Sequence, residues 1–164
     1  MEQTQFKVGD KVVYPVQGVA EVVRIETKNI GGSEQAFYVL HFQGLERKIL
    51  VPVKNADSVG IRALIGEGRI QQIFDILRSR DELVVGTTWH KRYKGFQDML
   101  KTGIVTDVAQ VLRDLLLLEK SKSKLSFGES QLRDRARGML VQEIAIARGQ
   151  SEQMVLDEVT AIFA

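Results

Sequence analysis

The sequence of 164 residues contains no cysteine, which excludes disulfide bonds, thiolate catalysis and cysteine-ligated zinc. It also has no run of about eighteen apolar residues, the length that a membrane-spanning helix requires. Its first residues, MEQTQFKVGD, hold no apolar stretch of the kind found in signal peptides. From these absences we expect a cytoplasmic protein that has no membrane partner.

Residues that carry enzymatic chemistry are also scarce. The two histidines, His41 and His90, do not have the spacing of metal ligands. No Walker-type phosphate loop and no GxSxG nucleophile motif occurs, and no nucleophile, base and orienting residue form a recognisable set. We therefore expect no catalysis, no metal ion, no cofactor and no small-molecule substrate.

The formal net charge is only +2, but the charges are unevenly distributed along the chain. Residues 91–137 carry eleven Lys and Arg against six Asp and Glu, whereas residues 138–164 carry one against four. A mixed, solvated surface is one interpretation of this pattern. The other is a surface in the internal segment that faces a polyanion.

The first part of the chain, residues 6–66, has the composition of short β-strands separated by turns. Apolar segments rich in β-branched and aromatic residues occur at 11–14, 18–27, 36–42 and 47–53. Alternation through residues 19–26 predicts one mostly apolar face, which includes Val19, Val23 and Ile25. Four or five such strands in about sixty residues predict a small, strongly bent antiparallel sheet or barrel.

From residue 67 the apolar residues recur at helical spacing. Ser126 and Glu129, in the segment SFGE, form a capping box that opens one helix, and Ser151 can cap the last one. Gly103 and Gly149 lie where helices are expected to end. The chain is thus predicted to be α+β, with a β domain over residues 1–66 and a bundle of about five helices over residues 67–164.

The only tryptophan, Trp89, lies in the segment TTWHKRYKG. Its spacing to Tyr93, Phe96 and Leu100 places all four residues on one face of a helix. This pattern by itself favours a tryptophan packed in the core of the bundle.

The position of Trp89 favours the opposite interpretation, in which the ring projects outward. A preceding threonine can cap the helix, which places Trp89 in the first turn, among Lys91, Arg92 and Lys94. Cations of this kind neutralise phosphates, and an apolar wedge can stack on or between bases at a distorted step. The segment is therefore a candidate nucleic-acid contact.

Four segments together resemble the CarD/CdnL family of bacterial transcription regulators. They are FKVGDKVVYPVQGVAEV, VPVKNADSVGIR, TTWHKRYK and DVAQVLRDLLLLEKSKSKLSFGE. The resemblance covers residues 6–163 in order, and the length of the chain is similar to that of the short CdnL-type members. It implies a Tudor-like N-terminal barrel that binds the β subunit of RNA polymerase, and a helical domain that contacts promoter DNA at the upstream edge of the −10 element.

The family stabilises the open promoter complex formed with the primary σ factor, notably at ribosomal RNA promoters, and the resemblance implies the same role here. The DNA contacts of the family fall on Trp89, Lys91, Arg92 and Lys94. Its contacts to the polymerase β subunit fall on Lys28, Val39, Leu50 and Pro52. Some members have Arg at the position of Leu50, so we expect a more apolar β-subunit contact in this chain.

Two other functions are compatible with the residues. One is a free-standing nucleic-acid-binding or architectural module, and the other is a protein–protein adaptor that makes no DNA contact. The β half, residues 1–66, carries eight Lys and Arg against seven Asp and Glu. This balance is poor for an autonomous nucleic-acid binder.

Overall fold

The computed structural model describes residues 5–15, 17–42, 44–81, 88–122 and 124–164. The chain divides into two compact units, Met1–Leu64 and Ile65–Ala164. This division lies two residues before the boundary expected from the change in sequence periodicity. Each unit has its own hydrophobic core.

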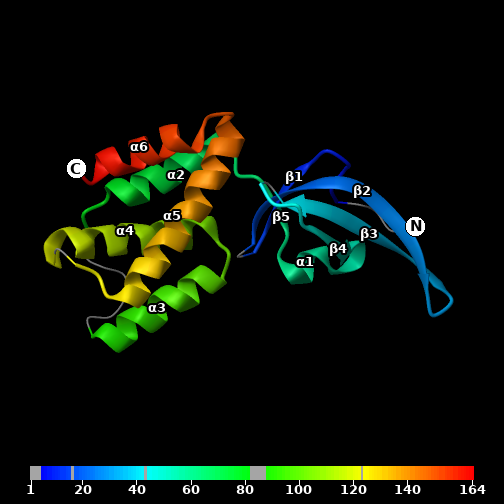
Figure 1. Cartoon of the computed structure of the whole chain (residues 1–164), viewed down its shortest axis with the longest axis horizontal. Helices are drawn as coiled ribbons and strands as arrows, with labels where there is room; N and C mark the ends of the chain where they lie inside the picture. The colour runs from blue at the N-terminus through cyan, green and yellow to red at the C-terminus, as the bar shows by residue number, and fades with distance from the viewer. Residues whose placement is uncertain (1–4, 16, 43, 82–87, 123) are drawn as a thin grey trace. The chain divides into compact units, whose positions relative to one another are not determined.

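The first unit, called the β unit below, is a five-stranded antiparallel sheet. Its strands are β1 (Lys11–Tyr14), β2 (Gly18–Ile30), β3 (Ser33–Phe42), β4 (Lys48–Pro52) and β5 (Arg62–Ala63). They pair in the order β4-β3-β2-β1-β5, and β2 and β3 form a long curved hairpin (Figure 1). Two short helical segments, η1 (Val53–Asn55) and α1 (Ala56–Val59), connect β4 to β5.

Strand β2 contains a bulge opposite β3. Val22 pairs with Leu40 and Arg24 pairs with Val39, so Val23 is an extra residue without a counterpart on β3. Because side chains alternate between the two faces of a sheet, one extra residue reverses the phase of every residue that follows it.

The bulge explains where the predicted alternation fails. The core of the β unit contains Ala20 and Val22 before the bulge, and Ile25 packs against that core after it. The uninterrupted alternation had grouped Val19 with Ile25 on one apolar face, which is wrong before the bulge. The phase changes within the strand, and no Gly or Pro marks the position.

Tyr38 holds the N-terminal segment onto the sheet of the β unit. Its side chain is fully buried, and its hydroxyl accepts hydrogen bonds from the backbone N–H groups of Gln5 (2.9 Å) and Phe6 (3.2 Å). The Phe6 ring meets the Tyr38 ring edge to face, with 5.7 Å between the centroids. The two N–H groups lie before β1 and have no partner in the sheet, so this one hydroxyl provides the acceptor for both.

The second unit, called the helical unit below, is a bundle of five helices. They are α2 (Glu67–Arg78), α3 (Trp89–Lys101), α4 (Val105–Lys122), α5 (Phe127–Arg148) and α6 (Glu152–Ile162). The long helix α5 packs against α3, α4 and α6, and α2 packs against α4 (Figure 1). The predicted α+β class, with a small antiparallel β domain followed by about five helices, is confirmed.

The helix ends follow the predicted capping residues. Ser126 and Glu129 form the capping box of α5, and the Ser151 hydroxyl accepts a hydrogen bond from a backbone N–H of α6. Gly149 ends α5 in the left-handed conformation, with a φ of 66°. Among the helices that the structure describes, none is both long enough and apolar enough to cross a membrane.

We expect Tyr38→Phe to lower the free energy of unfolding of the β unit by about 1–3 kcal/mol, because it leaves the buried N–H of Phe6 and the partly buried N–H of Gln5 without an acceptor. Amide hydrogen exchange of Phe6 and urea unfolding would measure this. Tyr14→Phe is the matched control, since the Tyr14 hydroxyl has no hydrogen-bond partner within the described residues. Equal effects of the two substitutions would contradict the anchoring role.

Candidate nucleic-acid interface

Helix α3 begins at Trp89 because Thr88 caps it. The Thr88 backbone is extended, and its hydroxyl accepts a hydrogen bond from the backbone N–H of Lys91 (3.4 Å). Thr87, the other capping residue that the sequence allowed, lies outside the described residues. Trp89 is thus the first residue of α3, where a side chain can extend past the end of the helix.

The ring of Trp89 lies at the surface of the helical unit, and 43% of the residue is exposed. One face of the indole stacks on Tyr93, with 5.2 Å between the centroids and 6° between the planes. The indole Nε1–H points at the Ser126 hydroxyl at 3.4 Å. The packed-core interpretation therefore does not hold for Trp89, although Phe96 and Leu100 of the same stripe are buried.

Ser126, which the indole N–H of Trp89 points at, belongs to the capping box of α5. The Ser126 hydroxyl accepts a hydrogen bond from the Glu129 backbone N–H (3.2 Å), and the Glu129 carboxylate accepts one from the Ser126 backbone N–H (3.4 Å). The same carboxylate accepts a hydrogen bond from Arg92 Nε at 2.9 Å. The indole acceptor and the partner of Arg92 are thus two residues of one capping box.

Gly128 lets the Tyr93 ring approach α5 closely. A Cβ atom built at Gly128 would lie 2.8 Å from Cε2 of Tyr93, well inside normal contact distance. Any other residue at this position would have to displace the Tyr93 ring, so glycine allows the close approach, with no need for an unusual backbone conformation. Tyr93 lies between α5 and the indole, and the ring of Trp89 rests on it.

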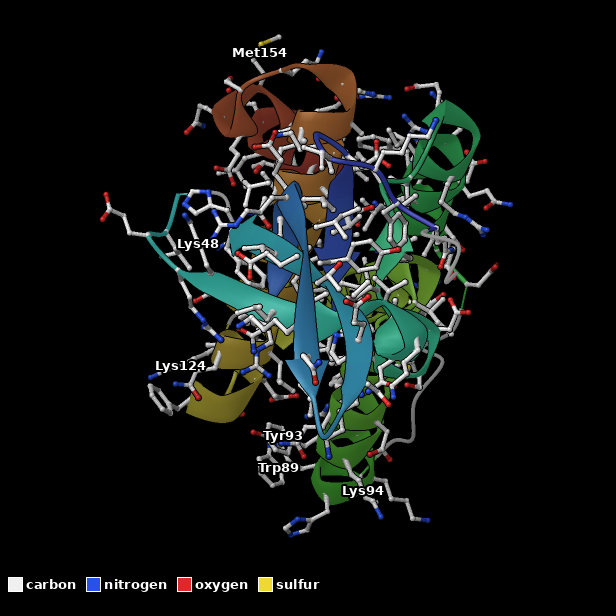
Figure 2. All side chains as sticks on the ribbon, turned by 90° about the vertical axis from the view of Figure 1, so that its right-hand side faces the viewer. Lys48, Trp89, Tyr93, Lys94, Lys124 and Met154 are labelled. Atoms are coloured by element: carbon white, nitrogen blue, oxygen red, sulfur yellow. The ribbon has the colours of Figure 1, made fainter. Side chains whose placement is uncertain are left out.

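The positive charge around the indole comes from exposed lysines and from two helix N-termini. Lys91, Lys94 and Lys124 are exposed. Figure 2 shows the Trp89 and Tyr93 rings together, with Lys94 and Lys124 labelled on either side of them. The contact between Trp89 and Ser126 brings the first turns of α3 and α5 together, and a helix N-terminus carries partial positive charge.

Arg92 differs from its basic neighbours. Its side chain is 7% exposed, and the side chain of its partner Glu129 is 4% exposed. A guanidinium held in a buried ion pair with a carboxylate is not presented to a phosphate at the surface. In this arrangement Arg92 joins α3 to α5, and of the three basic residues predicted to contact phosphates only Lys91 and Lys94 are exposed.

The predicted polymerase contacts lie on the face of the sheet that points away from the core of the β unit. Tyr38 and Leu40 of β3 belong to that core, so the residue between them, Val39, points to the outer face. Leu50 of β4 lies directly opposite Val39 in the strand register. Residues that pair in this way share a face.

The other two residues follow from the same register. Pro52 lies opposite Phe37, and Lys28 lies opposite Gln35. Phe37 and Gln35 are two and four residues before Val39 on β3, so all of them point to the outer face. Lys28 is nevertheless about 13 Å from the Val39 position, at about 3.3 Å per residue.

Exposure separates the members of this outer face. Leu50 is 42% exposed and Lys28 is exposed, whereas Val39 is only 2% exposed. Val39 therefore has almost no exposed surface with which to contact a partner. Strand β4 is the end strand in the order of the sheet, and the only strand that it pairs with in the described part of the chain is β3.

Four residues of the α3–α5 contact were not identified as site residues from the sequence. They are Tyr93, Ser126, Gly128 and Glu129. The capping box was visible, but nothing in its spacing indicates that its serine faces the indole. Among the residues that can be described, no group of three or more His, Cys, Asp or Glu could hold a metal ion.

Comparison with known protein families places both units. A model of the CarD-like/TRCF RID domain matches residues 6–65, and a model of the CarD C-terminal domain matches residues 72–160. The chain belongs to the CarD family. CarD is a family of transcription factors rather than of enzymes, and the RID domain type is one that interacts with RNA polymerase.

The chain is also similar to individual proteins. YdeB of Bacillus subtilis (strain 168), named as a candidate transcription factor, is 29% identical over 152 residues, which is 92% of this chain and 97% of that protein. Among solved structures, CdnLNt from Myxococcus xanthus is 46% identical, covers 41% of this chain and 94% of its own, and has a TM-score of 0.34. The 72-residue N-terminal domain of M. xanthus CarD is 32% identical, covers 38% and 84%, and has a TM-score of 0.32.

The Arg92–Glu129 pair makes the helical unit sensitive to acid. Burial by itself raises the pKa of Glu129, but hydrogen bonds from Arg92 and Ser126 outweigh it and hold the pKa below its ordinary value of 4.5. A lowered pKa contributes stability that is present above about pH 4.5 and is lost as the pH falls through the folded-state pKa. Fluorescence of Trp89 during urea unfolding at a series of pH values would measure this loss.

We expect Glu129→Gln to lower the free energy of unfolding at pH 7 by about 3–5 kcal/mol, because it leaves Arg92 buried without a counter-charge. The substitution should also flatten the acid dependence. Glu119→Gln is the control, since the pair between Glu119 and Arg133 is more exposed and should cost at most about 1 kcal/mol. An acid dependence that is unchanged in Glu129→Gln would contradict the assignment to Glu129.

Proposed function

We propose that this CarD-family protein binds the β subunit of RNA polymerase through its β unit and stabilises the open promoter complex through its helical unit. In this proposal the helical unit lies at the upstream edge of the −10 element, in complexes formed with the primary σ factor. Trp89 presses on the distorted base step there. The observation that carries the proposal is the exposed indole, stacked on Tyr93 on one face and flanked by exposed lysines.

The energetic argument depends on the difference between closed and open DNA. A ligand shifts a two-state equilibrium only by its differential affinity for the two states. An aromatic ring stacks on an unstacked base and gains about 1–3 kcal/mol, which it cannot gain from an intact duplex. This difference corresponds to a change of about five- to 150-fold in the population or lifetime of the open complex.

Phosphate contacts position the ring without reading the sequence. Lys91 lies in the first turn of α3 and Lys94 in the second, and both are exposed. Each can neutralise a phosphate on either side of the step that Trp89 contacts. Arg92 contributes indirectly, because its bond to Glu129 keeps the start of α3 against α5.

The outer face of the sheet supports the polymerase contact. Leu50 is an exposed apolar residue on an end strand, and end strands can extend the sheet of a partner by backbone pairing. Neither contact has to be strong alone. Binding to polymerase raises the effective concentration of the helical unit at the promoter, so modest DNA affinity is sufficient.

Trp89→Ala should shorten the lifetime of the open complex by about five- to 150-fold and leave polymerase binding unchanged. Competitor-challenged promoter complexes, followed with and without the protein, give the lifetime. Met154→Ala is the matched control, because Met154 is a similarly exposed apolar residue elsewhere in the helical unit (Figure 2). A lifetime that is the same in Trp89→Ala and wild type would exclude the wedge role.

Leu50→Glu should weaken binding to the polymerase β subunit by at least about tenfold, because it places a charge in an apolar contact. A pull-down with β-subunit fragments measures this, and circular dichroism checks that the sheet is intact. Leu45→Glu is the control, since Leu45 is also exposed but lies in the turn between β3 and β4.

If the protein binds promoter DNA equally well with and without polymerase, the free-standing module is the better description.

A further inference from the structure

A pocket of about 420 Å³ lies between α3 and α5, next to the ring that supports Trp89. Its lining consists of Tyr93, Gln97, Gln131, Leu132, Asp134 and Arg135. The volume is within the range of about 300–1,000 Å³ that small-molecule sites occupy. The pocket begins at Tyr93 and extends to Gln97, which follows Trp89 by eight residues and so lies about 12 Å along α3 from it, at 1.5 Å per residue.

The two amide side chains of the pocket are available to a ligand. Gln97 and Gln131 make no side-chain hydrogen bond to any residue that the structure describes. Two other glutamines of the helical unit have side chains that are bonded within the protein. Gln110 donates to Asp114, and Gln153 donates to Asp157. Two unpaired amides from different helices therefore converge on one pocket, each with a donor and an acceptor.

The charge of the pocket fits an anionic ligand. Asp134 already has two counter-charges, Arg133 at 3.0 Å and Arg137 at 3.1 Å. Arg135 is exposed, and its side chain makes no ion pair with another described residue. A guanidinium without a carboxylate partner can bind a phosphate through two hydrogen bonds.

We propose that this pocket is a nucleotide subsite, in which Gln97 and Gln131 bind the edge of an unpaired base and Arg135 binds its phosphate. This inference rests on the proposed function, because it takes the strand that passes Trp89 to continue along the groove between α3 and α5. Base edges present donors and acceptors side by side, which is the pattern that amides match. At about 3.4 Å per stacked base, the subsite lies within about four nucleotides of the base that stacks on Trp89.

The test uses the full chain and forked promoter DNA, a duplex that ends in a short unpaired strand. The fluorescent base 2-aminopurine is placed in turn at each of the first unpaired positions. Stacking on Trp89 should quench it at one position, and binding in the pocket should perturb it at a second position. Wild-type protein is then compared with Gln97→Ala, Gln131→Ala and Arg135→Ala.

We expect the pocket substitutions to abolish the signal at the second position and to keep the quenching at the first. Each glutamine substitution should also raise the Kd for forked DNA by about 2- to 12-fold, the loss of one hydrogen bond. Gln150→Ala is the matched control, because Gln150 is a glutamine with an exposed side chain that lies beyond the end of α5. Circular dichroism should show the same fold for all variants, since neither glutamine of the pocket has an internal partner.

The possible results separate the subsite from the proposed function. If wild type gives no second signal, or if the pocket variants retain it, the subsite is overturned while the wedge role of Trp89 stands. If Trp89→Ala leaves the open-complex lifetime unchanged but the pocket variants still lose the second signal, the proposed function fails and the subsite remains. An equal rise in Kd for Gln150→Ala would also count against the subsite.

Discussion

The position of the exposed Trp89 ring depends on the buried ion pair between Arg92 and Glu129. This pair joins the first turn of α3 to the first turn of α5, and Glu129 also completes the capping box with Ser126. A buried charge pair adds little net stability compared with apolar packing, but separating its partners leaves a buried charge without a counter-charge, which is strongly destabilising. Its role here is geometric, because the same turn of α5 supplies the acceptor for the indole and the surface against which Tyr93 rests.

Much of the helical unit could be predicted from residue spacing and end signals. The apolar stripes, the capping box and the glycine at the end of α5 are local features, and each lies within a few residues of the chain. The location of Trp89 at a helix start was also predictable. The orientation of Arg92 was not, since it depends on Glu129, thirty-seven residues away in the sequence. Charge composition alone treats Arg92 and Lys91 alike, although one is buried and the other exposed.

In the β unit, too, a long-range contact decided what the local sequence could not predict. Composition identified the main strands, but the bulge at Val23 exchanges the two faces of β2 partway along its length. Because of this extra residue, Lys28 points to the outer face of the sheet, which is the face that carries Leu50 and Pro52 of β4. A register change of this kind is decided by pairing with β3, so no single-strand pattern can reveal it. The predicted polymerase contacts thus share a face partly because of the bulge in β2, which the sequence of β2 alone does not reveal.

The stacking of Trp89 on Tyr93 lowers the entropy cost of binding a partner at this ring. A free indole on a flexible side chain samples several rotamers and loses that freedom when it binds. Here one face of the ring is already held at 5.2 Å from Tyr93 and its N–H already points at Ser126. The side chain is preorganised, so the entropy of fixing it was spent when the chain folded, and more of the stacking energy remains for binding a partner on the free face of the ring, as in the proposed contact with DNA.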